Sequence, residues 1–200
     1  MVFCFLLPLS VLAALPDLMV PANRLKRSAE VVYHYFPPDD CAVVEGCVRT
    51  AGTRRLLLFD GAIANIGRGD AFIGDPADRP DLFEYSPCHG HMHIYGFAAY
   101  KLLKKNGTVL LTGRKQGYCM RDEAPFLSSA TDTPHFDCSF QGITAGWQDI
   151  YDKSLDCQWL DITGIPAGIY ILRIKANPER IFPERNFANN VTDVQVRIPF

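Results

Sequence analysis

Six cysteines spread over residues 41–157 constrain the fold of this chain more than any other feature. They are Cys41, Cys47, Cys88, Cys119, Cys138 and Cys157, and a seventh, Cys4, lies in the apolar stretch at the start. An even number of cysteines in an exported chain indicates a disulfide framework. Free thiols in a reducing compartment are the alternative, and a structural zinc site is disfavoured because no CxxC pair occurs. The sequence alone does not select the pairing.

The first residues are the reason to expect export. The stretch MVFCFLLPLSVLAALPDL is an apolar run that is short for a bilayer crossing, and Ala13 and Ala14 supply the small residues of a cleavage site. We therefore expect a signal peptide over residues 1–15, one domain over residues 16–200, a secreted or periplasmic location and no stable membrane span. Because no Lys or Arg stands near the start, a truncated gene start or a buried N-terminal strand is the alternative interpretation.

Hydrophobic patterning predicts a mainly β protein. With 200 residues, 48% of them hydrophobic, the chain is long enough for one substantial core, and its net charge of −2 argues against a nucleic-acid partner. Short apolar runs bounded by turn residues recur in RRLLLFDGAIANIG, FAAYKLLKKNGTVLLTG, GIYILRIKANP and NNVTDVQVRIPF, and no long helical period is present. We expect a single-domain, β-sandwich-like core with long loops and disulfide staples. Asn106-Gly107 predicts a hairpin with a type I′ turn.

Three of the five histidines alternate within the run CHGHMH. If residues 88–95 are extended, His89, His91 and His93 project from one face of the strand. Three imidazoles suit Cu(II), Zn(II) or Ni(II) and leave coordination positions open, as in a catalytic centre. The spacing does not choose between these metals. An exposed histidine-rich tract that binds metal adventitiously is the alternative.

Two further segments carry reactive side chains. GRKQGYC places Lys115 four residues before Cys119, and DIYDKSLDCQWLDIT places Tyr151 six residues before Cys157. Together with SPCHGHMH, QGITAGWQDIYD and DCQWLDITGIPAGIYILRI, these segments resemble the catalytic domain of lysyl oxidases, from about Asp17 to the C-terminus. The motifs occur in the family's order and near its spacing.

The resemblance implies a copper- and quinone-dependent amine oxidase. In the family pattern His89, His91 and His93 match the Cu(2+) ligands, and Lys115 and Tyr151 match the pair that becomes lysine tyrosylquinone. The implied reaction uses dioxygen to convert primary amines, peptidyl lysine among them, to aldehydes with release of ammonia and hydrogen peroxide. Asp149 and Asp152 are candidate general bases by their closeness to Tyr151, with exposed loop carboxylates as the alternative.

The resemblance also implies the disulfide pairs Cys41–Cys88, Cys47–Cys157 and Cys119–Cys138. It further implies a calcium site, because oxygen donors suit a hard cation. The matching positions in PDL and PERNFANN are Asp17, the backbone carbonyl of Leu18, Glu184, Asn186, Asn189 and Asn190. Asn186 replaces the family's usual aspartate, which should weaken binding. The alternative is that the asparagines cap turns.

The chain departs from the family pattern in two other places. Tyr85 and Ser86 stand where the family usually has tryptophan and histidine, so the surround of the copper should differ. Pro125 and Trp147 stand where the family commonly has two more cysteines, so one bridge is lost as a pair. A non-catalytic extracellular copper-binding or adhesion β-domain is the alternative function, and intact Lys115 and Tyr151 count against it.

Overall fold

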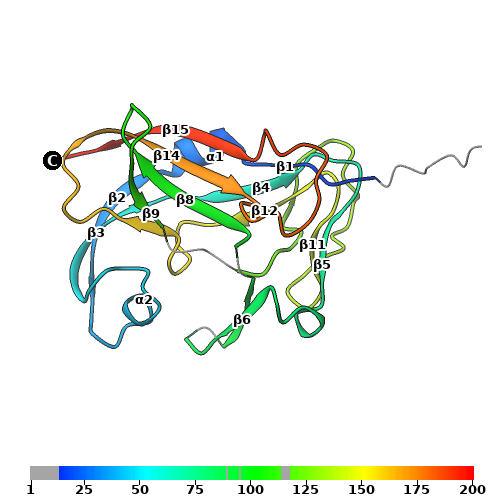
Figure 1. Cartoon of the computed structure of the whole chain (residues 1–200), viewed down its shortest axis with the longest axis horizontal. Coiled ribbons are helices and arrows are strands. Elements are labelled where there is room, and N and C mark those ends of the chain that lie inside the picture. The colour runs from blue at the N-terminus through cyan, green and yellow to red at the C-terminus, as the bar shows by residue number, and fades with distance from the viewer. Residues whose placement is uncertain (1–13, 89, 95, 114–117) are drawn as a thin grey trace, which may run out of the picture.

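The computed structural model describes residues 14–200 except 89, 95 and 114–117. Of His91 it describes the backbone but not the side chain. The fold is mainly β, as the hydrophobic patterning predicted (Figure 1). Its helices are short: α1 spans Ala22–Ser28, α2 spans Cys41–Val44, and a 3-10 turn spans Pro76–Asp78. Within the described residues, no helix has the length and apolar character needed to cross a membrane.

The C-terminal half supplies most of a four-stranded antiparallel sheet. Its strands, in spatial order, are β15 (Val191–Ile198), β14 (Gly168–Ala176), β8 (Ala98–Leu103) and β9 (Val109–Thr112). Along β15 buried and exposed residues alternate, with Val194, Val196 and Ile198 turned inward, so one face of the sheet meets the core. Both strands predicted near the C-terminus are therefore confirmed.

The predicted hairpin between β8 and β9 is confirmed, but its turn type is not. Gly107 has φ 87°, whereas Asn106 is not among the residues with positive φ, and a type I′ turn needs positive φ at both central positions. Instead the Gly107 amide donates to the Lys104 carbonyl at 2.9 Å and the Lys104 amide to the Thr108 carbonyl at 2.8 Å. Gly107 alone takes the left-handed conformation, which closes a longer loop.

A second four-stranded sheet packs against the first across the core. It orders β1 (Leu18–Met19), β4 (Gly61–Asn65), β12 (Trp147–Tyr151) and β10 (Ala124–Pro125). Every residue of β4 is buried, because β4 is a central strand with neighbours on both sides. Side chains of both sheets share one hydrophobic cluster, in which Phe59 and Tyr100 meet edge to face with centroids 5.0 Å apart.

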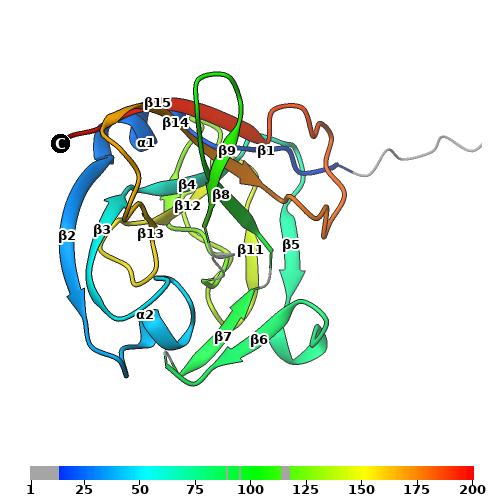
Figure 2. The ribbon, with the colours of Figure 1, turned by 60° about the vertical axis from the view of Figure 1, so that its left-hand side comes forward.

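The described residues also form three smaller sheets. They pair β13 (Trp159–Asp161), β3 (Gly52–Leu58) and β2 (Glu30–Phe36); β11 (Gln141–Ile143) and β5 (Ala71–Gly74); and β6 (Phe83–Ser86) and β7 (His91–Ile94). Figure 2 shows the β6–β7 hairpin and α2 at the end of the molecule away from β14 and β15.

The structure contains three disulfides, Cys41–Cys88, Cys47–Cys157 and Cys119–Cys138, the pairs implied by the family resemblance. The first joins α2 to the turn before β7. The second joins the segment after α2 to the turn after β12, and the third begins next to Tyr118. Each bridge therefore has one cysteine in a segment singled out in the sequence: Cys88 in SPCHGHMH, Cys157 in DIYDKSLDCQWLDIT and Cys119 in GRKQGYC. Loops of these lengths typically gain about 2–4 kcal/mol per bridge.

The expected signal peptide lies almost wholly outside the described residues. Of residues 1–15, the structure describes Ala14 and Leu15, and the Leu15 carbonyl accepts hydrogen bonds from the amides of Arg68 at 3.2 Å and Gly69 at 3.3 Å. The boundary at residue 15 stays a prediction.

Candidate functional site

Tyr151 and Asp149 form a buried pair on β12. Inward-facing Trp147, Asp149 and Tyr151 alternate along this strand with half-buried Gln148 and Ile150, as the period of a strand requires. Tyr151 is 4% exposed and Asp149 is 1% exposed, and the Tyr151 hydroxyl donates to Asp149 Oδ2 at 2.7 Å. The pair is thus a phenol and a carboxyl group in direct contact and shielded from water.

Burial sets the protonation of both groups. It raises the pKa of the Asp149 carboxyl to about 7, because the hydrogen bond from Tyr151 only partly offsets the lost hydration. Burial also raises the pKa of the Tyr151 phenol well above its ordinary value, and the charge of Asp149 acts in the same direction. Near neutral pH the Asp149 carboxyl can therefore take up or release a proton, as a general base must.

Side chains pack closely against Gly61, which stands opposite Tyr151. Gly61 is the register partner of Tyr151 on β4, and a Cβ there would lie 3.1 Å from Gln158 Nε2 and 3.2 Å from the Tyr100 hydroxyl. The Gln158 side chain is held in place here, since its amide nitrogen donates to the Phe59 carbonyl at 3.1 Å and its amide oxygen accepts from the Tyr100 hydroxyl at 3.2 Å. Gln158 and Tyr100 thus pack against β4 next to the backbone of Tyr151.

Tyr118 links the β12 pair to the histidine strand. Its ring centroid lies 5.3 Å from that of Tyr151 and 5.9 Å from that of His93. Burial raises the pKa of the Tyr118 phenol, which hydrogen-bonds to the Asp156 carbonyl. An imidazole of the predicted metal strand therefore lies one aromatic ring away from Tyr151.

The histidine strand is shorter than predicted. β7 begins at His91, and Gly90, with φ 69°, interrupts the extended run expected over residues 88–95. Within β7 Met92 and Ile94 pack against the core and the His93 ring meets Tyr118, and the shared face of the three histidines stays a prediction. His89 lies outside the described residues, as does the side chain of His91. The three-histidine metal site stays a prediction.

Lys115 also lies outside the described residues, but both ends of its segment are placed. On one side the Gly113 amide donates to the Tyr100 carbonyl at 2.8 Å. On the other side the Tyr118 ring lies against that of Tyr151, tilted by 31°. Tyr100 and Tyr151 both approach Gly61, so the two ends converge on the same part of the core. The pairing of Lys115 with Tyr151 stays a prediction.

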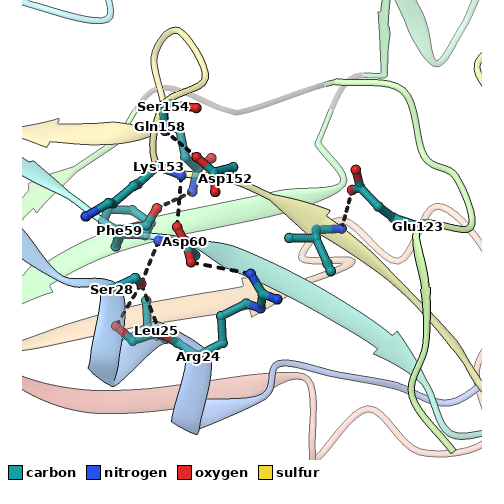
Figure 3. A network of polar contacts seen from close by, with 11 residues as sticks. Arg24, Leu25, Ser28, Phe59, Asp60, Glu123, Asp152, Lys153, Ser154 and Gln158 are labelled. Atoms are coloured by element: carbon teal, nitrogen blue, oxygen red, sulfur yellow. Dashed lines mark hydrogen bonds and ion pairs between the residues drawn. The ribbon is translucent and has the colours of Figure 1, made fainter.

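The two candidate bases differ sharply. Asp152 is exposed, its Oδ1 accepts the Ser154 amide at 2.9 Å, and hydrogen bonds from Ser154 lower the pKa of its carboxyl. Figure 3 shows Asp152 in this turn, beside Lys153, whose amide donates to Asp60 Oδ1 at 3.0 Å. Asp152 therefore closes the turn after β12, and Asp149 is the candidate base that the geometry favours.

The two residues at which the resemblance implies a lost bridge are exposed Pro125 and buried Trp147. Pro125 on β10 and Trp147 on β12 are register partners, so these two residues stand opposite each other as bridged cysteines would. Trp147 is 5% exposed and its indole donates to Thr131 Oγ1 at 2.9 Å. Packing of Trp147 thus anchors the strand that carries Asp149 and Tyr151.

A second polar cluster joins the start of the described chain to the loop before β15. We call Asp17, Glu184, Asn189 and Asn190 the Asp17 cage. Asp17 Oδ1 accepts Asn189 Nδ2 at 2.7 Å, and Glu184 Oε1 accepts Asn190 Nδ2 at 2.8 Å. The Leu18 amide donates to Glu184 Oε2 at 2.7 Å. The cage therefore brings together four of the five side chains predicted for calcium, and Leu18 meets it through its backbone amide rather than through the predicted carbonyl.

Asn186 is the exception. Its side chain is exposed, and its Oδ1 accepts the Ala188 amide at 3.0 Å, so it caps its own turn. Arg185, which the sequence did not single out, instead reaches Asp17 Oδ2 with Nε at 2.8 Å and with Nη2 at 2.7 Å. The calcium site stays a prediction, and its donor set is complicated by a guanidinium group.

Tyr118 and Arg185 are the site residues that the sequence did not reveal. Each had a local signal: Tyr118 stands beside Cys119 in GRKQGYC, and Arg185 stands inside PERNFANN. Neither signal says which distant side chain the residue meets. That information came from the fold.

The fold and site define a disulfide-linked, mainly β protein whose buried phenol–carboxyl pair stands near an imidazole. The sequence model of the lysyl oxidase family matches residues 16–199, and the chain belongs to this family. It is 32% identical over 197 residues to lysyl oxidase homolog 2 of Rattus norvegicus, covering 91% of this chain and 24% of that protein. With lysyl oxidase homolog 3 of Homo sapiens it shares 35% identity over 162 residues, covering 75% of this chain and 21% of that protein.

The chain spans about a quarter of the length of the curated relatives it matches, such as homolog 2, of which it covers 24%. Among solved structures, the CARDB domain of a Pyrococcus furiosus protein aligns with a TM-score of 0.35 and 11% identity, over 92% of this chain and 88% of that chain. A likeness this low carries no argument about the present fold.

Proposed function

We propose that this protein is a copper-dependent amine oxidase of lysyl oxidase type. It would oxidise primary amines, peptidyl lysine among them, to aldehydes, with dioxygen as the second substrate and ammonia and hydrogen peroxide as products. The observation that carries the proposal is the buried Tyr151–Asp149 pair near His93, in a chain that belongs to this family. The three disulfides support a secreted or periplasmic location.

The residues that match the family pattern would supply the implied cofactors, and of these the structure describes the side chains of His93 and Tyr151. His89, His91 and His93 would hold Cu(2+), a metal that imidazole ligands suit, and His93 lies one ring away from Tyr151. Lys115 and Tyr151 would supply the amine and the phenol of lysine tyrosylquinone. Once formed, the quinone would serve as the electron sink that the oxidation of an amine requires.

The protein's own groups would position the substrate and move its proton. The Asp149 carboxyl, with a pKa raised to about 7 by burial, is the proposed acceptor for the proton on the substrate carbon next to the amine. Tyr151 and Asp149 are almost fully buried, so the carboxylate would be little weakened by hydration. Packing of Gln158 and Tyr100 against Gly61 would keep the neighbouring backbone of Tyr151 in place.

The proposal is tested by forming the cofactor and measuring turnover. The full chain is expressed, loaded with copper under air, and assayed for quinone absorbance and for hydrogen peroxide release that depends on a primary amine. Proteolysis followed by mass spectrometry should recover one peptide that joins Lys115 to Tyr151. Tyr151→Phe should abolish the absorbance, the joined peptide and the peroxide.

Tyr170→Phe is the matched control, because it also removes a buried phenol. The Tyr170 hydroxyl donates to the Pro166 carbonyl, and Tyr170 lies on β14 rather than on β12. This variant should keep the absorbance and the turnover. Copper binding without the joined peptide in the unaltered protein would instead support a non-catalytic copper-binding domain. Full oxidase activity in Tyr151→Phe would show that the cofactor assignment is wrong.

A further inference from the structure

Two buried carboxylates meet in the Asp17 cage, and burial of such charges is costly unless donors or cations compensate them. Asp17 is 0% exposed and Glu184 is 6% exposed. Glu184 is compensated by neutral donors: the Leu18 amide on Oε2, and the amide nitrogens of Asn177 at 2.7 Å and Asn190 at 2.8 Å on Oε1. Asp17, in contrast, is compensated by a positively charged side chain.

Arg185 brings that charge to Asp17. Its Nε and Nη2 both donate to Asp17 Oδ2, at 2.8 and 2.7 Å, while its own backbone amide donates to the Pro16 carbonyl at 2.8 Å. The Arg185 side chain is 56% exposed, so the guanidinium sits at the mouth of the cage and Asp17 lies inside. A guanidinium stays protonated at any physiological pH, which makes this charge permanent.

Two buried amide oxygens of the cage without a hydrogen-bond partner indicate what Arg185 replaces. Asn189 Oδ1 and Asn190 Oδ1 are buried and accept no hydrogen bond, although the amide nitrogens of the same side chains donate to Asp17 and Glu184. Buried polar atoms without a partner are rare. Two carboxylates and two unpartnered amide oxygens form a donor set typical of a hard cation such as Ca²⁺.

We propose that Arg185 is the resident cation of the Asp17 cage and holds the start of the domain to the 184–190 loop without a requirement for calcium. With Asn186 turned to solvent, the cage contains two carboxylates and one guanidinium, so little charge is left to attract Ca²⁺. Removing Arg185 should expose an oxygen site that takes Ca²⁺ in its place. The inference concerns the fold and does not rest on the proposed oxidase activity.

Arg185→Gln and Arg180→Gln are the test and its matched control. Both variants remove one arginine from the segment before β15, but Arg180 lies over the Phe187 ring at 4.5 Å, whereas Arg185 is the arginine that pairs with Asp17. Melting temperatures are measured on the copper-loaded full chain in calcium-depleted buffer, with and without added CaCl2, with MgCl2 as the ionic control. Ca²⁺ affinity is measured by isothermal titration calorimetry.

The unaltered protein and Arg180→Gln should show no calcium-dependent shift in melting temperature. Arg185→Gln should melt several degrees lower without calcium, regain stability when Ca²⁺ is added, and bind Ca²⁺ at least about tenfold more tightly than the unaltered protein. Should Arg185→Gln not fold without calcium, refolding yield with and without Ca²⁺ gives the same readout. Arg185→Lys, which keeps the charge, should stay calcium-independent.

Two outcomes would overturn the inference. One is a calcium-dependent shift in the unaltered protein as large as that in Arg185→Gln, because Arg185 would then not take the place of the ion. The other is an Arg185→Gln variant that does not respond to Ca²⁺, whatever its stability, because the cage would then not be a cation site. Neither result depends on whether the protein oxidises amines.

Discussion

Asp149 and Asp17 are buried to the same extent and are treated in opposite ways by their surroundings. Asp149 is 1% exposed and receives a hydrogen bond from a neutral phenol, whereas Asp17 is 0% exposed and receives two N–H groups from a guanidinium. The nearby charges of Glu123 and Arg121 act on the pKa of Asp149 in opposite directions, so burial dominates and raises it to about 7. A carboxyl without a cation becomes a proton acceptor, and one with a cation becomes a structural link.

Asp149→Asn should have the largest effect, because it removes the proposed proton acceptor and keeps the shape of the side chain. Loss of a general base typically costs about 10²–10⁴ in rate. We expect kcat for amine-dependent peroxide release to fall by that factor. The rate is expressed per mole of quinone, so that a loss of cofactor is not counted as a loss of turnover. The bell-shaped dependence of the residual rate on pH should also lose its limb near pH 7.

Asp152→Asn is the matched control, since it makes the same change at the residue directly after Tyr151 but at an exposed position. This variant should keep kcat within about twofold, as expected for an exposed carboxyl outside the site. If Asp149→Asn kept normal turnover while Asp152→Asn lost it, the roles assigned to the two carboxyl groups would be reversed.

The raised pKa of Asp149 also predicts how stability depends on pH. In copper-free protein, folded Asp149 holds its proton up to about pH 7, whereas the unfolded carboxyl loses it near pH 4. Between these values the folded state binds more protons, so the free energy of unfolding should fall as pH rises, by up to about 1.4 kcal/mol per pH unit, and then level off. Urea denaturation across this range measures the slope.

Asp149→Asn should flatten that slope, because asparagine does not titrate. The difference between the two proteins isolates Asp149 from other groups, such as Asp161, whose carboxyl has a lowered pKa and acts in the opposite direction. Identical pH profiles for the two proteins would mean that the buried carboxyl is already ionised in the folded state.

The fold was more predictable than the site, and the reason is the range of the interactions involved. Alternation along β14 and β15 and the loop at Gly107 are properties of consecutive residues, so the sequence revealed them. The turn type was missed because Gly107 alone supplies the positive φ, and the start of β7 was missed because Gly90 breaks the strand. Both errors concern the backbone conformation of one residue.

The site depended on contacts that no local pattern encodes. Arg185 meets Asp17 across 168 residues, and Tyr118 meets Tyr151 from a different segment of the chain. Closeness to Tyr151 in the sequence supplied the candidates Asp149 and Asp152, and burial then separated them. Chemistry-bearing residues could thus be nominated from the sequence, whereas their partners and protonation required the folded structure.

Asp17→Asn tests the structural side of the comparison. This substitution removes the charge that Arg185 meets inside the cage, and hydrogen bonds to charged groups contribute about 1.5–3 kcal/mol each. We expect the free energy of unfolding to fall by about 2–3 kcal/mol in urea denaturation, with no change in the slope of stability against pH that Asp149 causes.

Asp193→Asn is the control, because Arg173 pairs with Asp193 through similar contacts at 2.6 Å but with side chains 38% and 40% exposed. An exposed pair of this kind contributes less than about 1 kcal/mol. Equal losses from Asp17→Asn and Asp193→Asn would mean that burial does not strengthen the link at Asp17.

Asn186→Asp should have the smallest effect and separates two explanations for weak calcium binding. The substitution restores the carboxylate of the family pattern, but the side chain is exposed and Arg185 still occupies Asp17. We expect the Ca²⁺ affinity measured by calorimetry to rise by less than about tenfold. Asn106→Asp, in the exposed β8–β9 turn, is the control for the added charge. If Asn186→Asp alone bound Ca²⁺ as tightly as Arg185→Gln, the missing carboxylate rather than Arg185 would be what weakens calcium binding. The Arg185 guanidinium would still be present in that variant and would not have prevented binding.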